Sequence, residues 1–140
     1  MNAIISIKPR FVDAIKAGRK HYEFRRRPML RNVEKCFVYA TAPISAIVGE
    51  FEIANVLCAT PHELWEKTNL AAGIAKSDFD LYFTGCTKAY ALVIKNFKKY
   101  PRPIALRDAF PGAPIPQSYI YVRTADSEKF TQELLAKTKV

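Results

Sequence analysis

The chain has few of the residues on which disulfide frameworks, metal centres and phosphate-binding loops depend. Its 140 residues include three cysteines, two histidines and five glycines. The cysteines are odd in number and distant in sequence from both histidines, which argues against a disulfide framework or a zinc site. No glycine-rich nucleotide motif, metalloprotease motif or serine-hydrolase motif occurs. We therefore expect no cofactor and no bound metal.

Long apolar runs are also missing. No run approaches the ~20 apolar residues that a membrane-spanning helix needs, and residues 1–9 carry no signal-peptide pattern. In a reducing cytosol, Cys36, Cys58 and Cys86 are expected to act as small core hydrophobes. We predict a cytoplasmic protein without a membrane partner.

Positive charge is what the chain has in excess, and most of it lies near the start. Residues 1–40 hold ten Lys and Arg against three Asp and Glu, a balance of +7 within a net charge of +9. Residues 41–140 hold twelve against ten, a balance of +2. A local basic face predicts an anionic partner. The alternative is a generally basic, solvated surface.

The segment 18–27 concentrates this charge. Five of its ten residues are Lys or Arg, and two more are the aromatic residues Tyr22 and Phe24. Cations neutralise phosphates and aromatic faces stack on bases, so this segment is typical of a surface that meets a polyanion. Glu23 stands alone among the cations, which should keep it ionised. It can accept a hydrogen bond from a base edge or act as a general base.

Lys20 and Glu23 are the candidates for catalysis. Neighbouring Arg side chains favour the neutral form of Lys20, and Glu23 offsets this effect. Such a pair can transfer protons or recognise a nucleobase. An ordinary salt bridge, worth under about 1 kcal/mol, explains the same spacing. His21 lies in the same segment, where a surface contact is favoured over catalysis.

The apolar patterns predict a β-rich α+β fold, a small mixed or antiparallel barrel with flanking helices. The chain shows no repeat and no linker. Residues 101–117 hold five prolines and are expected to form an ordered loop with little regular structure. We expect strands at residues 3–7, 21–27, 33–41, 47–57, 89–97 and 119–122, and helices at residues 9–17, 60–69, 77–83 and 126–137.

Local patterns add detail to this outline. In the basic strand, Tyr22 and Phe24 share one face. The other face, which is expected to be exposed, carries His21, Glu23, Arg25 and Arg27. Thr60 is followed by a proline and, three positions on, by a glutamate, which predicts a helix N-cap. Two further expectations concern Gly49, as a bulge or close backbone approach, and Trp65, as helix–sheet packing.

The spacing Gly18-x-Lys20-x-x-Glu23-x-Arg25 resembles the GxKxxExR signature of the ASCH domain family. Residues 38–43, 48–51 and 116–119 also resemble segments of stand-alone prokaryotic members. The resemblance implies one domain over residues 1–140, with a core at about 3–122 and a C-terminal helical extension at about 126–137. It further implies a PUA-like β-barrel with flanking helices and a cleft at the signature strand.

The resemblance implies binding of RNA or of a modified nucleotide, in regulation linked to translation or transcription. A protein partner is the alternative occupant of the basic strand. In the first reading the arginines contact phosphates, Glu23 accepts from a base edge, and Tyr39, Thr41 and Ser118 form the wall of the cleft. The expected nucleic-acid-binding residues are Lys8, Arg19, Lys20, Glu23, Arg25, Arg26, Arg27, Tyr39, Thr41 and Ser118.

An enzyme is the competing interpretation: a nucleoside amidohydrolase or a ribonuclease, with Lys20 and Glu23 as the acid–base pair. Small bacterial proteins of similar fold hydrolyse acetylated cytidine with a Lys, a Thr and a Glu. Lys20 matches their Lys, but Glu23 stands at the Thr position, and the acidic residue falls near Ala71–Ala72, where this chain has no carboxylate. This departure argues against the amidohydrolase. A ribonuclease activity is associated with some members and stays open.

Overall fold

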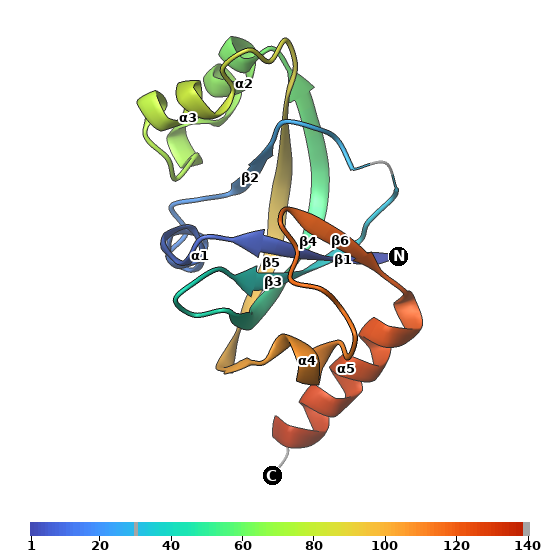
Figure 1. Cartoon of the computed structure of the whole chain (residues 1–140). Helices are drawn as coiled ribbons and strands as arrows, with labels where there is room; N and C mark the ends of the chain where they lie inside the picture. Colours follow the sequence, from blue (N-terminus) through green and yellow to red (C-terminus); the bar gives the residue numbers. More distant parts are fainter. Residues whose placement is uncertain (30, 139–140) are drawn as a thin grey trace.

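One curled sheet organises the chain. In the computed structural model, which describes residues 1–29 and 31–138, six strands pair in the order β2-β5-β4-β3-β1-β6. The strands are β1 (Asn2–Ile7), β2 (Tyr22–Arg25), β3 (Lys35–Ala40), β4 (Ala46–Ala59), β5 (Ala89–Ile104) and β6 (Tyr119–Val122). The sheet curls into a half-barrel, with β2 and β6 as its two edges (Figure 1).

The sheet is mixed. β1 runs parallel to β3, with Ile5 opposite Val38, whereas the other neighbours pair antiparallel. The parallel pair is possible because a helix and β2 lie between β1 and β3 in the chain and allow it to return to the same end of the sheet. The predicted β-rich α+β fold, a PUA-like barrel with flanking helices, is confirmed.

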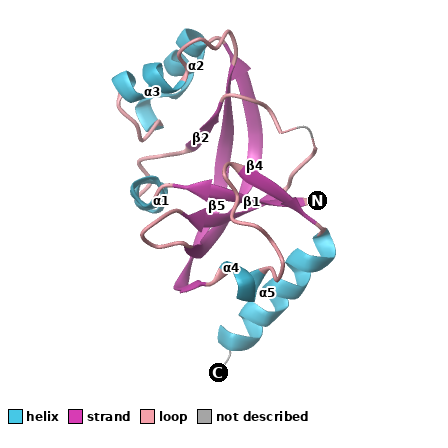
Figure 2. Cartoon of the chain, viewed as in Figure 1, coloured by secondary structure: helices cyan, strands magenta, loops and turns pink. Residues whose placement is uncertain are grey.

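The helices gather at the two ends and one side of the sheet (Figure 2). They are α1 (Pro9–Lys16), α2 (Pro61–Thr68), η1 (Asn69–Ala71, a 3-10 turn), α3 (Lys76–Tyr82), α4 (Leu106–Ala109) and α5 (Thr124–Thr138). We call the segment 61–82 the cap; it sits at the far end of the long β4–β5 hairpin, while α4 and α5 lie at the opposite end. The predicted N-cap is confirmed, since the Thr60 hydroxyl accepts from the backbone N–H of Glu63 at 3.2 Å.

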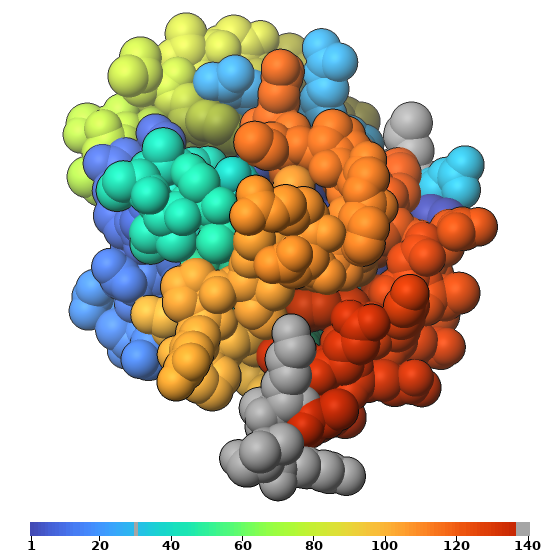
Figure 3. Space-filling model, turned by 60° about the horizontal axis from the view of Figure 1, so that its bottom comes forward, coloured from blue at the N-terminus to red at the C-terminus, as the bar shows by residue number. Residues whose placement is uncertain are grey.

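Alternation along the strands separates two apolar cores on the two faces of the sheet. Ile5 and Val38 belong to the core that α1 covers. Phe37, Phe110 and Phe130 belong to the core on the other face, where α4, α5 and the segment between α4 and β6 cover the sheet (Figure 3).

A third apolar cluster fixes the cap to β2. Phe24 meets Phe79 and Phe83 edge-on, with ring centroids 5.1 and 6.2 Å apart. Trp65 of α2 packs on Phe79 of α3, with ring centroids 5.0 Å apart, so this contact joins two helices rather than a helix and the sheet. Trp65 also packs against the apolar cluster that includes Phe24 of β2. The aromatic residue of the signature strand therefore anchors the cap.

Two expectations, one about the proline-rich segment and one about the cysteines, were wrong in part. β5 continues through Pro101 and Pro103 to Ile104, and α4 follows it, so residues 101–109 are not irregular. The prolines fit because the paired residues of β5 skip from Lys99, opposite Gly49, to Ile104, opposite Ile47. Pro101 and Pro103 lie between them and pair with no residue of β4. Cys58 is exposed rather than a core residue, whereas Cys36 is buried.

Across residues 1–29 and 31–138, no helix is long and apolar enough to cross a membrane. Over the same residues, His, Cys, Asp and Glu side chains form no group of three that could hold a metal ion.

Gly49 is confirmed as a point of close backbone approach. A Cβ there would lie 2.5 Å from the carbonyl oxygen of Lys98 on β5, at an irregularity in the β4–β5 register. We expect Gly49→Ala to lower the free energy of unfolding by about 1–3 kcal/mol, because neither backbone can move without disturbing the ladder. Urea unfolding measures this. Val56→Ala, at an exposed position of the same strand, should cost less than about 1 kcal/mol; equal losses would contradict the steric explanation.

Candidate functional site

A cleft of about 1070 Å³ opens beside β2, between α1, the cap and the segment that leads into β6. Eight of the ten predicted binding residues line it. They are Lys8, Lys20, Glu23, Arg25, Arg26, Arg27, Thr41 and Ser118. The structure thus brings together residues from four separate stretches of the sequence.

Arg19 and Tyr39 lie outside the lining of the cleft. Arg19 is exposed in the turn after Gly18. The prediction that Tyr39 forms a wall of the cleft was wrong: it is 4% exposed and packs in the core on the opposite face of the sheet, beside Phe37. The two residues are two positions apart on β3 and therefore point the same way. Thr41 reaches the cleft because β3 ends at Ala40.

Lys20 is buried at the inner end of the cleft. Its side chain is 3% exposed, and Nζ donates to the carbonyl oxygen of Ala72 at 3.3 Å. Nζ also lies 4.9 Å from the ring centroids of both Phe11 and Phe24. Burial lowers the pKa of Lys20 below its ordinary value; the charge of Glu23 opposes this shift, and that of Arg25 adds to it.

The close packing around Lys20 depends on Gly73. Gly73 has a φ of +67°, and a Cβ there would overlap the Lys20 stem, at 2.8 Å from Cγ. Lys20 also forms an isolated antiparallel bridge with Ala72. The cap loop and the signature lysine are therefore fitted to each other. Sequence patterns gave no sign of this contact, because it joins residues about fifty positions apart.

Glu23 and Arg25 form the ion pair of the cleft. Arg25 Nη2 lies 3.6 Å from Glu23 Oε1, and each side chain is only 12% exposed. The expectation of an exposed polar face therefore holds for His21 and Arg27 but was wrong for Glu23 and Arg25, which pair with each other inside the cleft. The salt bridge expected between Lys20 and Glu23 also does not form among the described residues, since the amine turns to Ala72 and the carboxylate to Arg25.

Two polar atoms of this pair are buried without a hydrogen-bond partner: Oε2 of Glu23 and Nε of Arg25. An unpaired buried acceptor or donor costs roughly 1–3 kcal/mol, so native proteins rarely leave one unless a ligand or water completes it. Because both residues line the cleft, a bound molecule that offers a donor to Glu23 would remove this cost.

Arg25 also connects the two open edges of the sheet. Its Nη1 donates to the hydroxyl of Ser118 at 2.6 Å, and Nη2 donates to the carbonyl oxygen of Ser6 at 3.4 Å. Ser6 in turn holds the segment before β6, because its N–H donates to Ser118 O at 2.9 Å and its hydroxyl donates to Pro116 O. Ser6 was not predicted as a site residue, since a serine in an apolar strand carries no functional signal by itself.

Tyr82 is a second cleft residue that sequence reasoning missed. Arg26 places its guanidinium 4.4 Å from the Tyr82 ring centroid, and its Nε donates to Tyr82 O at 2.6 Å. The Tyr82 hydroxyl donates to Phe24 O at 3.3 Å, and burial raises the pKa of this phenol. The pattern of α3 predicted only a short apolar helix, so the tyrosine looked like a core residue.

The composition of the cleft favours an anionic ligand. Lys8, Arg26 and Arg27 are exposed at its rim. Among the described residues that line it, Glu23 is the only carboxylate. Ala72 lies against Lys20, where the hydrolases of acetylated cytidine are expected to carry their acidic residue, and no carboxylate of the described lining replaces it.

The fold and the site define a PUA-like barrel with a basic cleft at its signature strand. The chain belongs to the ASCH domain family, whose model matches residues 5–103. A relative from Zymomonas mobilis, named ASCH domain-containing ribonuclease, is 29% identical over 131 residues, covering 91% of this chain and 88% of the relative. The crystal structure of ASCH from Zymomonas mobilis superposes with a TM-score of 0.84 at 28% identity, covering 94% of each chain.

Two further similarities show less, because one covers a small part of the other protein and one has low sequence identity. Large ribosomal subunit protein uL22 of Ureaplasma parvum is 33% identical over 84 residues, which is 60% of this chain but 27% of that protein. The N-terminal domain of Staphylothermus marinus McrB has a TM-score of 0.55 at 13% identity, over 94% of this chain and 93% of that domain. The latter likeness concerns the fold alone.

The lowered pKa of Lys20 predicts a pH dependence of stability. Between the folded-state pKa and the ordinary value of 10.5, the unfolded chain binds more protons than the folded chain, so the free energy of unfolding rises with pH across this window. Lys20→Met keeps the apolar stem and removes the titration. The wild type should therefore gain stability relative to Lys20→Met from neutral pH up to about pH 10.5 and no further above it.

Urea unfolding at a series of pH values measures this difference. Lys16→Met, which removes an exposed ammonium group from α1, serves as the control for general charge effects. A wild-type minus Lys20→Met difference that stays constant with pH, or that follows the control, would contradict the burial of a charged lysine.

Proposed function

We propose that this protein binds RNA in the cleft beside β2. The observation that carries the proposal is the buried, unpartnered Oε2 of Glu23, set among basic side chains that line the same cavity. A basic rim attracts a polyanion, and an acceptor in the interior selects a group that offers N–H or O–H donors. A nucleotide of RNA combines both features.

The phosphates belong at the rim. Lys8 and Arg27 are exposed there and can turn towards a backbone without breaking the core, whereas Arg26 is held on Tyr82. Arginine suits this task because its planar fork matches phosphate oxygens in pairs. Arg25 is already committed to Ser6 and Ser118, so its role is to hold the cleft in shape rather than to contact phosphate freely.

The base belongs inside. The Oε2 atom of Glu23 can accept from an amino or imino group on a base edge. The Arg26–Tyr82 stack lies beside it and provides a flat face of the kind that holds an unstacked base. Similarity of part of this chain to a protein named as a component of the large ribosomal subunit also supports an RNA partner. A role in translation-linked regulation would follow from such binding.

Salt dependence of binding tests the proposal. Each phosphate neutralised on a single strand contributes a slope of about −0.7 in log K against log salt. We expect wild-type protein to bind single-stranded RNA with such a slope, and Arg27→Ala and Lys8→Ala each to reduce the slope by about 0.7. Fluorescence anisotropy over a salt series measures both.

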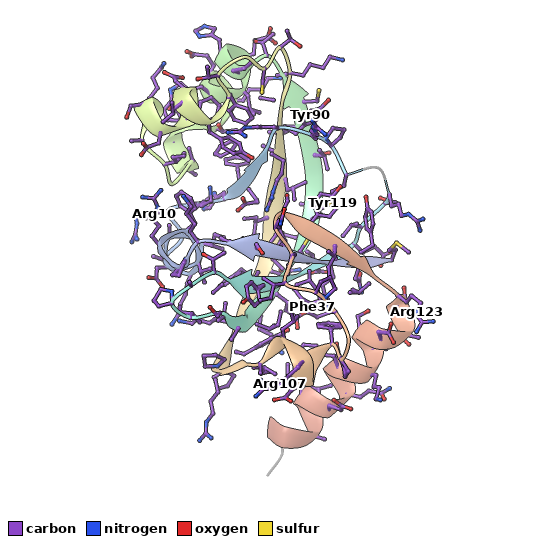
Figure 4. The ribbon with its side chains drawn as sticks, viewed as in Figure 1. Arg10, Phe37, Tyr90, Arg107, Tyr119 and Arg123 are labelled. Carbon is purple, nitrogen blue, oxygen red and sulfur yellow. The ribbon has the colours of Figure 1, made fainter. Side chains whose placement is uncertain are left out.

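Arg107→Ala is the matched control. Arg107 is an exposed arginine on α4, at the end of the molecule away from β2 (Figure 4). It should leave the slope unchanged. Absence of binding at low salt, or equal effects of Arg27→Ala and Arg107→Ala, would overturn the proposal. Tight binding of a free modified nucleoside without salt dependence would assign the cleft to a small molecule instead.

RNA cleavage is the second candidate, and the name of the Zymomonas mobilis relative favours it. In the simplest balanced step, the ribose 2′-oxygen attacks the adjacent phosphorus, and the bond from phosphorus to the 5′-oxygen breaks. Glu23 takes the proton of the attacking hydroxyl, and Lys20 gives one to the departing oxygen. Both residues line the cleft, and a lysine of lowered pKa is the better acid.

Glu23→Gln tests this chemistry, because the amide keeps the shape of the side chain but accepts a proton poorly. We expect end-labelled single-stranded RNA to be cut by the wild type to a 2′,3′-cyclic phosphate, and the rate to fall at least about 100-fold in Glu23→Gln. Glu34→Gln changes an exposed carboxylate outside the cleft and should not alter the rate. Binding without cleavage in the wild type would contradict this second function and leave the first intact.

A further inference from the structure

Positive charge continues beyond the cleft, along the segment that follows β2. Residues 24–33 contain four arginines and no carboxylate. Arg25 is held inside the cleft, whereas Arg27 and Arg31 are exposed. Glu23 and Glu34 flank this run on either side. A run of cations is typical of a surface that follows a phosphate backbone.

Two tyrosines of the edge strand β6 lie along the same path. Tyr119 and Tyr121 point to the same side of β6, with ring centroids 5.4 Å apart and ring planes at 75°. Both are half-buried and pack their inner edges against the core. Arg31 holds its guanidinium 5.5 Å from the Tyr121 ring centroid, and its backbone N–H donates to the Tyr121 hydroxyl at 3.2 Å.

The cleft and this tyrosine pair are continuous. Tyr119 lines the cleft and touches Tyr121. Figure 4 labels Tyr119 at the start of β6. A ligand leaving the cleft therefore passes from one aromatic–arginine contact to the next without crossing an acidic side chain of these segments.

The path has an end. Arg123, after the last residue of β6, pairs with Asp126 at 3.1 Å and so already has a carboxylate partner. Among the described residues, Arg31 is therefore the last arginine along this path that forms no ion pair.

We propose that residues Arg27, Arg31, Tyr119 and Tyr121 form a track for single-stranded RNA that leads out of the cleft. The track rests on the proposed RNA binding and extends it: the ligand is a strand of several nucleotides, with one nucleotide in the cleft and its neighbours on β6. Bases stack against the tyrosines while the arginines accompany the backbone. Duplex RNA does not fit, because its bases are stacked on one another and cannot reach the rings.

A length series tests the track. The probes are uridine 5′-monophosphate and oligouridylates of two, four and six nucleotides, titrated at one fixed salt concentration. Base–aromatic stacking strengthens binding by roughly fivefold or more per base. Wild-type affinity should therefore rise at least about tenfold from the mononucleotide to the hexanucleotide.

Two variants address the track without touching the cleft. Arg31→Ala changes an exposed side chain, and Tyr121→Leu keeps apolar packing while it removes the flat ring. Each should weaken hexanucleotide binding about fivefold or more and leave mononucleotide binding unchanged. The matched control is Arg123→Ala, since that arginine is already paired with Asp126; it should leave both affinities unchanged.

Equal affinity for the mononucleotide and the hexanucleotide would overturn the track but leave RNA binding in the cleft. Equal effects of Arg31→Ala and Arg123→Ala would overturn it too. Failure to bind any of the probes would overturn the proposed function itself. Displacement of the hexanucleotide by hexaglutamate at equal concentration would show that the surface takes acidic peptides and would overturn its assignment to RNA.

Discussion

The interaction on which the site depends is the set of contacts made by one guanidinium group. In the half-barrel sheet, β2 and β6 are the edge strands. Each pairs with one neighbour, and its outer side pairs with no strand of the described residues. Arg25 on β2 spans this opening, since it reaches Glu23 on its own strand, Ser6 on β1 and Ser118 just before β6. The planar fork of arginine can serve three partners in fixed directions, which the point charge of lysine cannot do. The cleft is therefore the barrel's unclosed seam, and the arginine of the family signature is the side chain that bridges it.

This arrangement explains why the signature combines like and unlike charges. Lys20 and Arg25 repel each other, and burial of Lys20 raises the cost of its charge. Glu23 between them offsets part of that cost, yet it keeps Oε2 unpaired. Residues that are poorly satisfied by the fold alone concentrate at functional sites, because a ligand completes what folding leaves open. The same buried charges and the same unpaired oxygen that cost stability thus give the cleft its capacity to bind an anion that carries a donor group.

How far the sequence predicted this structure depended on the range of the interaction. The strand and helix pattern follows from local periodicity, as does the Thr60 N-cap, and the spacing of Gly18, Lys20, Glu23 and Arg25 located the cleft. Predictions failed where distant segments meet. Alternation along the basic strand indicated an exposed polar face, but Glu23 and Arg25 in its middle are enclosed in the cleft. Tyr39 was assigned to the cleft although its parity with Phe37 directs it to the opposite core. The contacts of Tyr82 with Arg26 and of Ser6 with Ser118 join segments that no local pattern relates.

The fit between Lys20 and Gly73 has a consequence for how such a chain can change over time. The lysine stem occupies the space that any side chain at position 73 would need. A side chain at position 73 would also have to adopt a φ of +67°, which residues other than glycine rarely do, so a smaller residue at position 20 would not by itself make room for one. The cap loop is thus closed to variation at position 73 for two independent reasons: its own backbone conformation, and a lysine about fifty positions earlier in the chain.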